Sequence, residues 1–211
     1  MRQAVLIILI GFLSACAGDA AAPRLDDALF HDEFTTGETA DWLLEGDALG
    51  RAAIVNEQLL LEVNAPNTIQ FATLNGMNFS DLALEVDVTQ LAGSLESSYG
   101  VLFRMQGPDA FYRFEITGNG LYMAERRNAD GTWTQFLDDW TEAAAINQGL
   151  RATNHLRVAA MGAGMAFYVN GVLLFETSDV QYATGTIALD GGTFGQPGLQ
   201  VVFDNVVVRQ P

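Results

Sequence analysis

Cysteine, lysine and histidine are scarce in this chain of 211 residues. It has one cysteine, Cys16, no lysine, and two histidines, His31 and His155. A single cysteine excludes an internal disulfide and, once it is modified, a cysteine nucleophile. Two isolated histidines lack the ligand spacing of a zinc site. The N-terminal apolar run, residues 4–13, is about half the roughly 20 residues that a membrane-spanning helix needs.

Basic residues are also few. Ten arginines face 26 acidic residues, for a formal net charge of −16. Removal of residues 1–15 would take away Arg2 and no acid, which makes the charge −17. Such a field disfavours nucleic acid and anionic lipid surfaces as partners. It is compatible with neutral glycans, with cations, or with a role in solubility alone.

The first residues have the pattern of an export signal. Arg2 precedes the apolar run, and the run ends in the small residues Ser14 and Ala15, as in a signal peptide. The segment Leu13-Ser-Ala-Cys16 resembles the bacterial lipobox, in which the cysteine is diacylated and becomes the new N-terminus. We therefore predict a signal peptide over 1–15, a lipidated Cys16 with a short Ala-rich tether over 16–27, and one domain over 28–211. The domain is expected to be extracytoplasmic, and only the lipid would hold it to the cell membrane or outer membrane.

Alternating apolar and polar residues recur along the rest of the chain and predict an all-β fold. In residues 82–89, Leu82, Leu84, Val86 and Val88 alternate with Ala83, Glu85, Asp87 and Thr89. Asn170-Gly171 predicts a tight hairpin, and a second hairpin is expected around Asn56-Glu57. Further strands are expected over 69–74, 99–106, 111–117, 121–126, 133–137, 155–160, 165–169, 172–177, 186–189 and 199–208. Only residues 141–148 have helical character. A dozen short strands with one apolar face each favour two antiparallel sheets packed core to core.

Several segments, in this order, resemble the concanavalin A-like lectin/glucanase superfamily, especially its laminin G-like and 3-keto-disaccharide hydrolase-like members. The segments are residues 30–34 with Trp42, 99–104, 111–114, 154–158, 167–171 and 203–206. The resemblance implies a jelly roll of two curved sheets, with the first strand beside the last and a concave face that commonly binds carbohydrate. Fold alone does not settle function.

Glucanases of this superfamily carry an acidic triad on one strand, and Glu85-Val-Asp-Val-Thr89 resembles it in part. Glu85 and Asp87 match its first two positions, but Thr89 and Gln90 stand where the second glutamate belongs. Because a retaining hydrolase needs two carboxyl groups that flank the glycosidic bond, this strand lacks its acid/base. We therefore expect no glucanase activity of this type.

A binding face is the stronger prediction. If the strands over 99–106 and 111–117 pair, Arg104, Arg113 and Glu115 share a surface, with Glu125 and Arg127 from the next strand. Trp133 and Trp140, in or beside loops, are candidates for the aromatic ring that stacks on a sugar. The same charges also suit simple cross-strand pairs, and the tryptophans also suit the core.

Calcium is a further candidate, because the resemblance implies a structural calcium near the terminal strands. Asp204 fits that place, and Asp32 in the first strand is expected near it.

These observations favour a lipid-anchored, non-catalytic, lectin-like domain that binds a poly- or oligosaccharide. Two other functions remain open. One is an enzyme of the 3-keto-disaccharide hydrolase-like type with Glu115 or Asp87 as general acid/base. The other is a structural or adhesive envelope module that binds protein through a sheet face.

Overall fold

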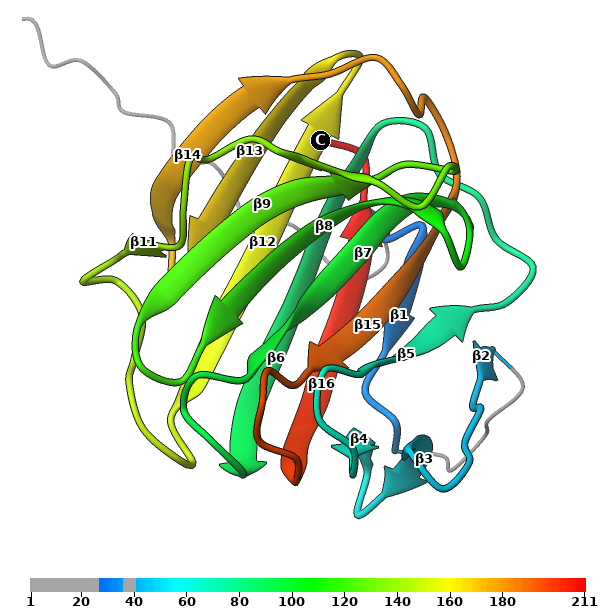
Figure 1. Cartoon of the computed structure of the whole chain (residues 1–211). Helices are drawn as coiled ribbons and strands as arrows, with labels where there is room; N and C mark the ends of the chain where they lie inside the picture. The colour runs from blue at the N-terminus through cyan, green and yellow to red at the C-terminus, as the bar shows by residue number, and fades with distance from the viewer. Residues whose placement is uncertain (1–26, 36–40) are drawn as a thin grey trace, which may run out of the picture.

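Two antiparallel sheets pack face to face in the computed structural model, which describes residues 27–35 and 41–211 (Figure 1). The predicted signal peptide over 1–15 and Cys16 lie outside the described residues, as does all of the tether except Asp27. Within the described ranges, no helix is long and apolar enough to cross a membrane.

Sheet 1 has eight strands in the order β14-β13-β12-β6-β16-β4-β3, with β1 paired to β16. Its strands are β1 (Phe30–Asp32), β3 (Gly50–Val55), β4 (Gln58–Val63), β6 (Leu82–Ala92), β12 (Thr153–Met161), β13 (Gly164–Val169), β14 (Val172–Ser178) and β16 (Leu199–Arg209).

Sheet 2 also has eight strands, in the order β10-β9-β8-β7-β15-β5-β2, with β11 paired to β9. Its strands are β2 (Trp42–Leu43), β5 (Ile69–Leu74), β7 (Ser98–Gly107), β8 (Ala110–Thr117), β9 (Leu121–Arg127), β10 (Trp133–Gln135), β11 (Thr141–Glu142) and β15 (Thr186–Gly192). In Figure 1, β7, β8 and β9 lie in front of β6, β12 and β16.

Side-chain alternation fills the space between the sheets. The four apolar residues predicted to share one face of β6, namely Leu82, Leu84, Val86 and Val88, are all in the core. From sheet 2, Tyr112, Phe114 and Ile116 of β8 enter the same core. The shared apolar face predicted for residues 82–89 is confirmed.

Both predicted hairpin turns form. Asn170 and Gly171 have φ angles of 51° and 80°, and Asn56 and Glu57 have φ angles of 51° and 61°. These left-handed conformations are those of a tight turn whose twist matches the flanking strands. The turns join β13 to β14 and β3 to β4.

Pairing between distant segments closes the sandwich. The last strand, β16, pairs with β1 and lies between β6 and β4, and β15 lies between β7 and β5. This arrangement is the predicted two-sheet jelly roll, with the first described strand beside the last.

The expected helical segment over 141–148 is wrong. Residues 141–142 instead pair with β9 as β11, and the following residues form turns. The segment is tied down by Ala143 N, which donates to Gly120 O at 3.0 Å, and by Asn147 N, which donates to Asn154 Oδ1 at 2.8 Å. These contacts satisfy the backbone without a helix.

Candidate functional site

Four neighbouring strands of sheet 2 bring charged side chains together on its outward face. Asp190 of β15 is opposite Gly100 of β7, and Gly100 is opposite Glu115 of β8. In the adjacent row, Arg113 of β8 is opposite Glu125 of β9. Residues two apart on a strand share a face, so all four charged side chains point away from the core.

Two glycines leave room for this cluster. A Cβ atom at Gly192 would lie 3.1 Å from Ser98 Oγ and 3.2 Å from Arg113 Nη2, and one at Gly100 would lie 2.7 Å from the Cα atom of Glu115. Because both positions lack a side chain, the guanidinium of Arg113 can reach across β7 to Asp190. Glycine inside a strand often marks such a close approach.

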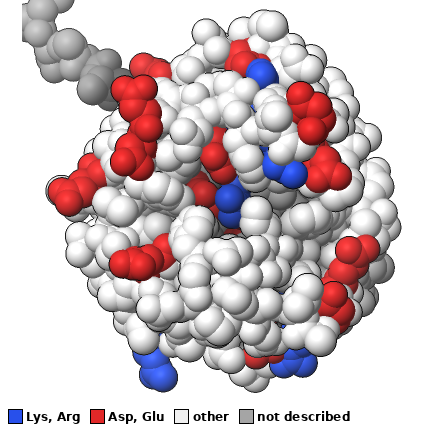
Figure 2. Space-filling view, viewed as in Figure 1, with Lys and Arg blue, Asp and Glu red and all other residues white. Residues whose placement is uncertain are grey.

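The result is a hollow of about 300 Å³, here called the charged hollow. Its lining includes three charged side chains, Arg113, Glu115 and Glu125, and three aromatic ones, Trp133, Trp140 and Phe194. Figure 2 shows a depression near the middle of this face, with acidic and basic atoms at its bottom.

The guanidinium of Arg113 forms ion pairs with three carboxylates at the charged hollow. Arg113 Nε donates to Asp190 Oδ2 at 2.7 Å, and its Nη2 lies 2.6 Å from both Asp190 Oδ2 and Glu115 Oε2. Its Nη1 lies 3.5 Å from Glu125 Oε1. All four side chains are buried. Asp190 Oδ1 is buried without a hydrogen-bond partner among the described residues.

Burial changes the protonation of these acids. It raises the pKa of Glu115 to about 8, against the attraction of Arg113 and with added repulsion from Asp190 and Glu125. Burial also raises the pKa of Glu125 and of Asp190, in both cases opposed by Arg113. At neutral pH the cluster therefore retains a proton that ordinary carboxylates would lose.

Aromatic rings border the charged hollow on two sides. Trp140 and Phe194 make an edge-to-face contact with centroids 6.0 Å apart, and Phe194 is 48% exposed. Trp133 is 36% exposed and meets Phe111 edge to face at 5.8 Å. Exposed aromatic rings beside fixed polar groups are the combination that sugar recognition uses: rings for the apolar ring face, and donors and acceptors for the hydroxyl groups.

Of the seven residues predicted for the binding face, five line the charged hollow: Arg113, Glu115, Glu125, Trp133 and Trp140. Arg127 lies at its edge, with its guanidinium carbon 5.0 Å from the Trp133 ring centre and its Nη2 3.7 Å from Asp109.

Arg104 is not in this group, which corrects the prediction that it shares a surface with Arg113. Arg104 has a φ of 47°, and the pairing of β7 with β8 shifts register just after Phe103. A bulge re-aims the side chains that follow it. Arg104 is fully buried and donates to the carbonyl oxygens of Ser80 at 3.0 Å and Gly162 at 2.9 Å. It joins loops at one end of the sandwich.

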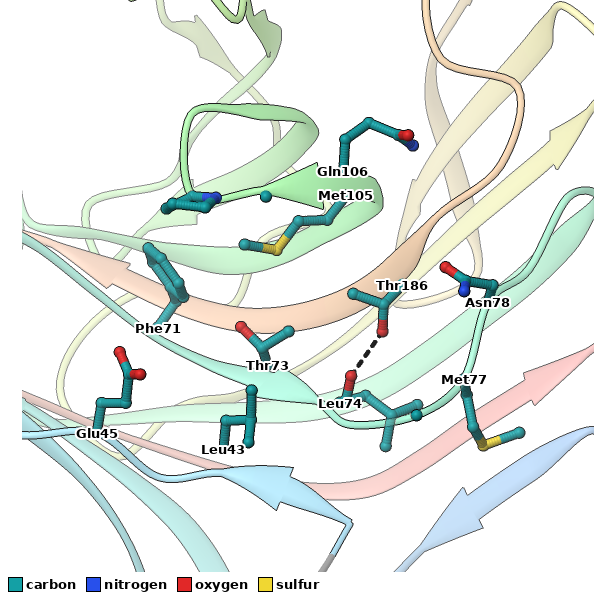
Figure 3. Close-up of a pocket in the computed structure, with 13 residues that line it drawn as sticks. Leu43, Glu45, Phe71, Thr73, Leu74, Met77, Asn78, Met105, Gln106 and Thr186 are labelled. Carbon is teal, nitrogen blue, oxygen red and sulfur yellow. Dashed lines mark hydrogen bonds between the residues drawn. The ribbon is translucent and has the colours of Figure 1, made fainter.

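A second and larger hollow, of about 480 Å³, lies on the same face (Figure 3). This apolar hollow is bordered by Leu43, Phe71, Thr73, Met105, Gln106 and Pro108, among others. Thr186 Oγ1 donates to Leu74 O at 2.7 Å beneath it.

Phe71 packs on the cluster of Leu102, Met105, Phe111 and Ala188, which forms an apolar floor beside the charged hollow. Glu45 is the one ionisable residue in the lining of the apolar hollow.

The partial glucanase motif lies elsewhere. Glu85, Asp87 and Thr89 are on the outward face of β6, in sheet 1. His155 Nδ1 lies 2.8 Å from Asp87 Oδ1, and Thr89 Oγ1 lies 2.8 Å from Thr153 Oγ1. Asp87 is thus on the opposite sheet from Glu115.

The two predicted calcium ligands have other partners. Asp32 accepts hydrogen bonds from Phe34 N at 2.7 Å and from Trp42 Nε1 at 2.9 Å, which uses both of its oxygens. Asp204 Oδ1 accepts from Asn205 N at 2.8 Å. Calcium takes six to eight oxygen ligands, many of which can be backbone carbonyl groups, and the described part of the chain has no group of three or more His, Cys, Asp or Glu side chains placed to hold a metal ion. Calcium binding by Asp204 and Asp32 therefore stays a prediction.

Sequence reasoning missed Asp190 and Phe194. Asp190 stands just before Gly191-Gly192 at the end of an apolar strand, and an acid followed by two glycines is a usable signal of a polar hollow. Phe194 follows two residues later in the loop after β15. The sequence does not predict that either side chain lies near β8.

The two packed antiparallel sheets have the arrangement of a jelly-roll β-sandwich. No family model matches the sequence, and no curated protein matches it.

Among solved structures, the carbohydrate binding module CBM66 from Bacillus subtilis superimposes with a TM-score of 0.64 at 18% identity, over 80% of this chain and 95% of that one. A Bacillus subtilis protein of unknown function with a galectin-like fold superimposes with a TM-score of 0.64 at 11% identity, over 87% of this chain and 96% of that one. A laminarinase from Flavobacterium sp. UMI-01 superimposes with a TM-score of 0.63 at 14% identity, over 87% of this chain and 100% of that one. The likeness shows the fold.

Proposed function

We propose that this protein is a non-catalytic, lectin-like domain that binds a poly- or oligosaccharide in the charged hollow of sheet 2. The observation that carries the proposal is the pairing of the buried Arg113–Glu115–Asp190 cluster with the half-buried ring of Trp140 and the exposed ring of Phe194. The carboxylates accept hydrogen bonds from sugar hydroxyl groups and the guanidinium donates to them, while the rings cover the apolar face of a pyranose. Similarity to a carbohydrate binding module and to a laminarinase supports a sugar ligand.

The test is a glycan array with the purified protein, with and without calcium, followed by titration of the best glycan. Trp140→Ala is expected to weaken binding at least about fivefold, because an aromatic contact is worth about 1 kcal/mol. The matched control is Val180→Ala, since Val180 is an exposed apolar residue in the loop between β14 and β15. An unchanged affinity for Trp140→Ala, or no glycan bound in either condition, would overturn the proposal. Calcium dependence would direct attention to Asp204.

A second candidate function has one observation in its favour. Glu115 holds a proton at neutral pH and lines the hollow with Glu125, close to the buried Asp190, so it has the protonation state of a general acid. This would suit a hydrolase of the 3-keto-disaccharide hydrolase-like type. Release of free sugar from a 3-keto disaccharide, lost in Glu115→Gln, would establish it; binding without turnover supports the lectin-like function.

We further propose that Cys16 anchors the protein outside the cytoplasm through a lipid. The support is the sequence pattern that ends in Leu13-Ser-Ala-Cys16, the only cysteine in the chain. In a bacterial host, the protein should incorporate a labelled palmitate analogue and sediment with membranes. Cys16→Ser should lose both properties; label retained by this variant would refute the anchor.

A further inference from the structure

Charge in the hollow is unbalanced. Glu115, Glu125 and Asp190 are 1%, 8% and 0% exposed, and Arg113, which pairs with all three, is 4% exposed. Arg127 at the edge also attracts Glu125, so three carboxylates face two cations. Buried carboxylates beyond the number of cations are costly, because each loses its hydration without a full partner. An incoming positive group would complete the pairing.

The cluster compensates for the excess of carboxylates by holding a proton. Burial is the main cause of the raised pKa of Glu115, about 8, and the nearby carboxylates on β9 and β15 raise this pKa further. From β7, the only polar side chain facing Glu115 is the neutral Ser98. A cation placed beside Glu115 would favour its ionised form and displace this proton.

The walls also suit a cation. Aromatic faces attract positive charge, and the Trp133 ring already has the Arg127 guanidinium carbon 5.0 Å from its centre and that of Arg113 at 5.9 Å. Phe194 and Trp140 offer further ring surface on the other side. The net charge of −16 attracts cations from a distance as well.

From these observations we infer that the charged hollow selects a sugar that carries a free amino group, such as a hexosamine without its N-acetyl group. The ammonium faces Glu115 and Glu125, and the sugar ring lies against Trp140 and Phe194. This inference rests on the proposed function and names its ligand class. An N-acetylated sugar has no charge to offer the carboxylates and brings a bulkier group to the same place.

Calorimetric titration of the purified protein at moderate salt tests this directly. The probes are the glucosamine trisaccharide, its N-acetylated counterpart, and spermidine as an amine without a sugar. The free-amine trisaccharide is expected to bind at least about tenfold more tightly than the other two, because loss of one partner of a buried charge pair is costly. Titrations in two buffers that differ in ionisation enthalpy should show proton release at pH 7.

Glu115→Gln keeps the shape of the side chain and removes its charge. It is expected to lower affinity for the free-amine trisaccharide at least about tenfold and to abolish the proton release, with a smaller loss of affinity for the N-acetylated sugar. Glu176→Gln is the matched control, because Glu176 is exposed on β14 of the other sheet. It should change nothing.

Three outcomes would overturn the inference. Equal binding of both trisaccharides, lost in Trp140→Ala, would leave the lectin-like function standing and remove the amine preference. Equal loss of affinity in Glu115→Gln and Glu176→Gln would assign the preference to overall charge. Binding of spermidine alone, or of no probe and no arrayed glycan, would remove the proposed function as well.

Discussion

Glu115 of β8 and Asp190 of β15 face each other across Gly100 of β7, and both contact the same nitrogen of Arg113 at 2.6 Å. No side chain stands between these two carboxylates, since the residue that separates them is a glycine. Four consecutive strands therefore hold a single electrostatic unit. Its members should respond together to pH, to mutation and to ligand.

Stability should fall as the pH rises from about 5 to about 8. The folded-state pKa of Glu115, about 8, lies above its unfolded value near 4.5, so the folded chain binds more protons in this window and loses free energy of unfolding as they leave. Melting temperatures between pH 5 and pH 9 measure this. Glu115→Gln should flatten the slope and Glu176→Gln should keep it. A slope identical in all three proteins would contradict the expectation.

Removal of Arg113 should be strongly destabilising at high pH and less so at low pH. Arg113→Met leaves three buried carboxylates without their common cation, which costs about 3–5 kcal/mol. Chemical denaturation at pH 8.5 and pH 5 measures the difference. Because protonation neutralises the stranded acids, the loss should shrink at pH 5. A loss equal at both pH values would mean that Arg113 acts through packing instead.

Arg104 should matter for folding and not for binding. Arg104→Met removes the donor to the carbonyl groups of Ser80 and Gly162. It also removes the cation beside Asp81, whose Oδ1 still accepts from Gly162 N at 2.8 Å. We expect a loss of about 3 kcal/mol, since buried groups left unsatisfied cost about 1–3 kcal/mol each. Denaturant titration measures it. Ligand affinity, measured where the variant is folded, should be unchanged, and a selective loss of affinity would return Arg104 to the binding site.

Two adjacent glycines should differ in their effect on ligand affinity. Gly192→Ala adds a methyl group 3.1 Å from Ser98 Oγ and 3.2 Å from Arg113 Nη2, so it should displace the guanidinium, lower stability and lower ligand affinity severalfold. Gly191→Ala points into the core, 3.1 Å from Leu199 and 3.3 Å from Val201, and should cost about 1–3 kcal/mol with affinity retained. Parallel titrations and melts compare them; equal loss of affinity in both variants would contradict the placement of the hollow.

Local patterns predicted much of this structure. Period-two alternation identified the inward face of β6 and of β8, and Asn170-Gly171 identified its hairpin, because side-chain direction and turn type depend on neighbouring residues. The same reasoning brought Arg113 to the face that also holds Glu115. It failed at Arg104, where a left-handed residue in a bulge breaks the alternation, and at residues 141–148, where tertiary hydrogen bonds replace a weak helical tendency.

The amino-acid sequence alone determined the all-β class, the strand faces and five of the residues that line the charged hollow. Only the tertiary structure decided that β15 lies beside β7, which brings Asp190 to an arginine 77 positions earlier in the chain. It also decided that Glu85 and Asp87 lie on the sheet away from the hollow. The reason is physical. Alternation fixes which side of a strand a residue faces, but strand order depends on long-range pairing and on how the two sheets bury their faces together.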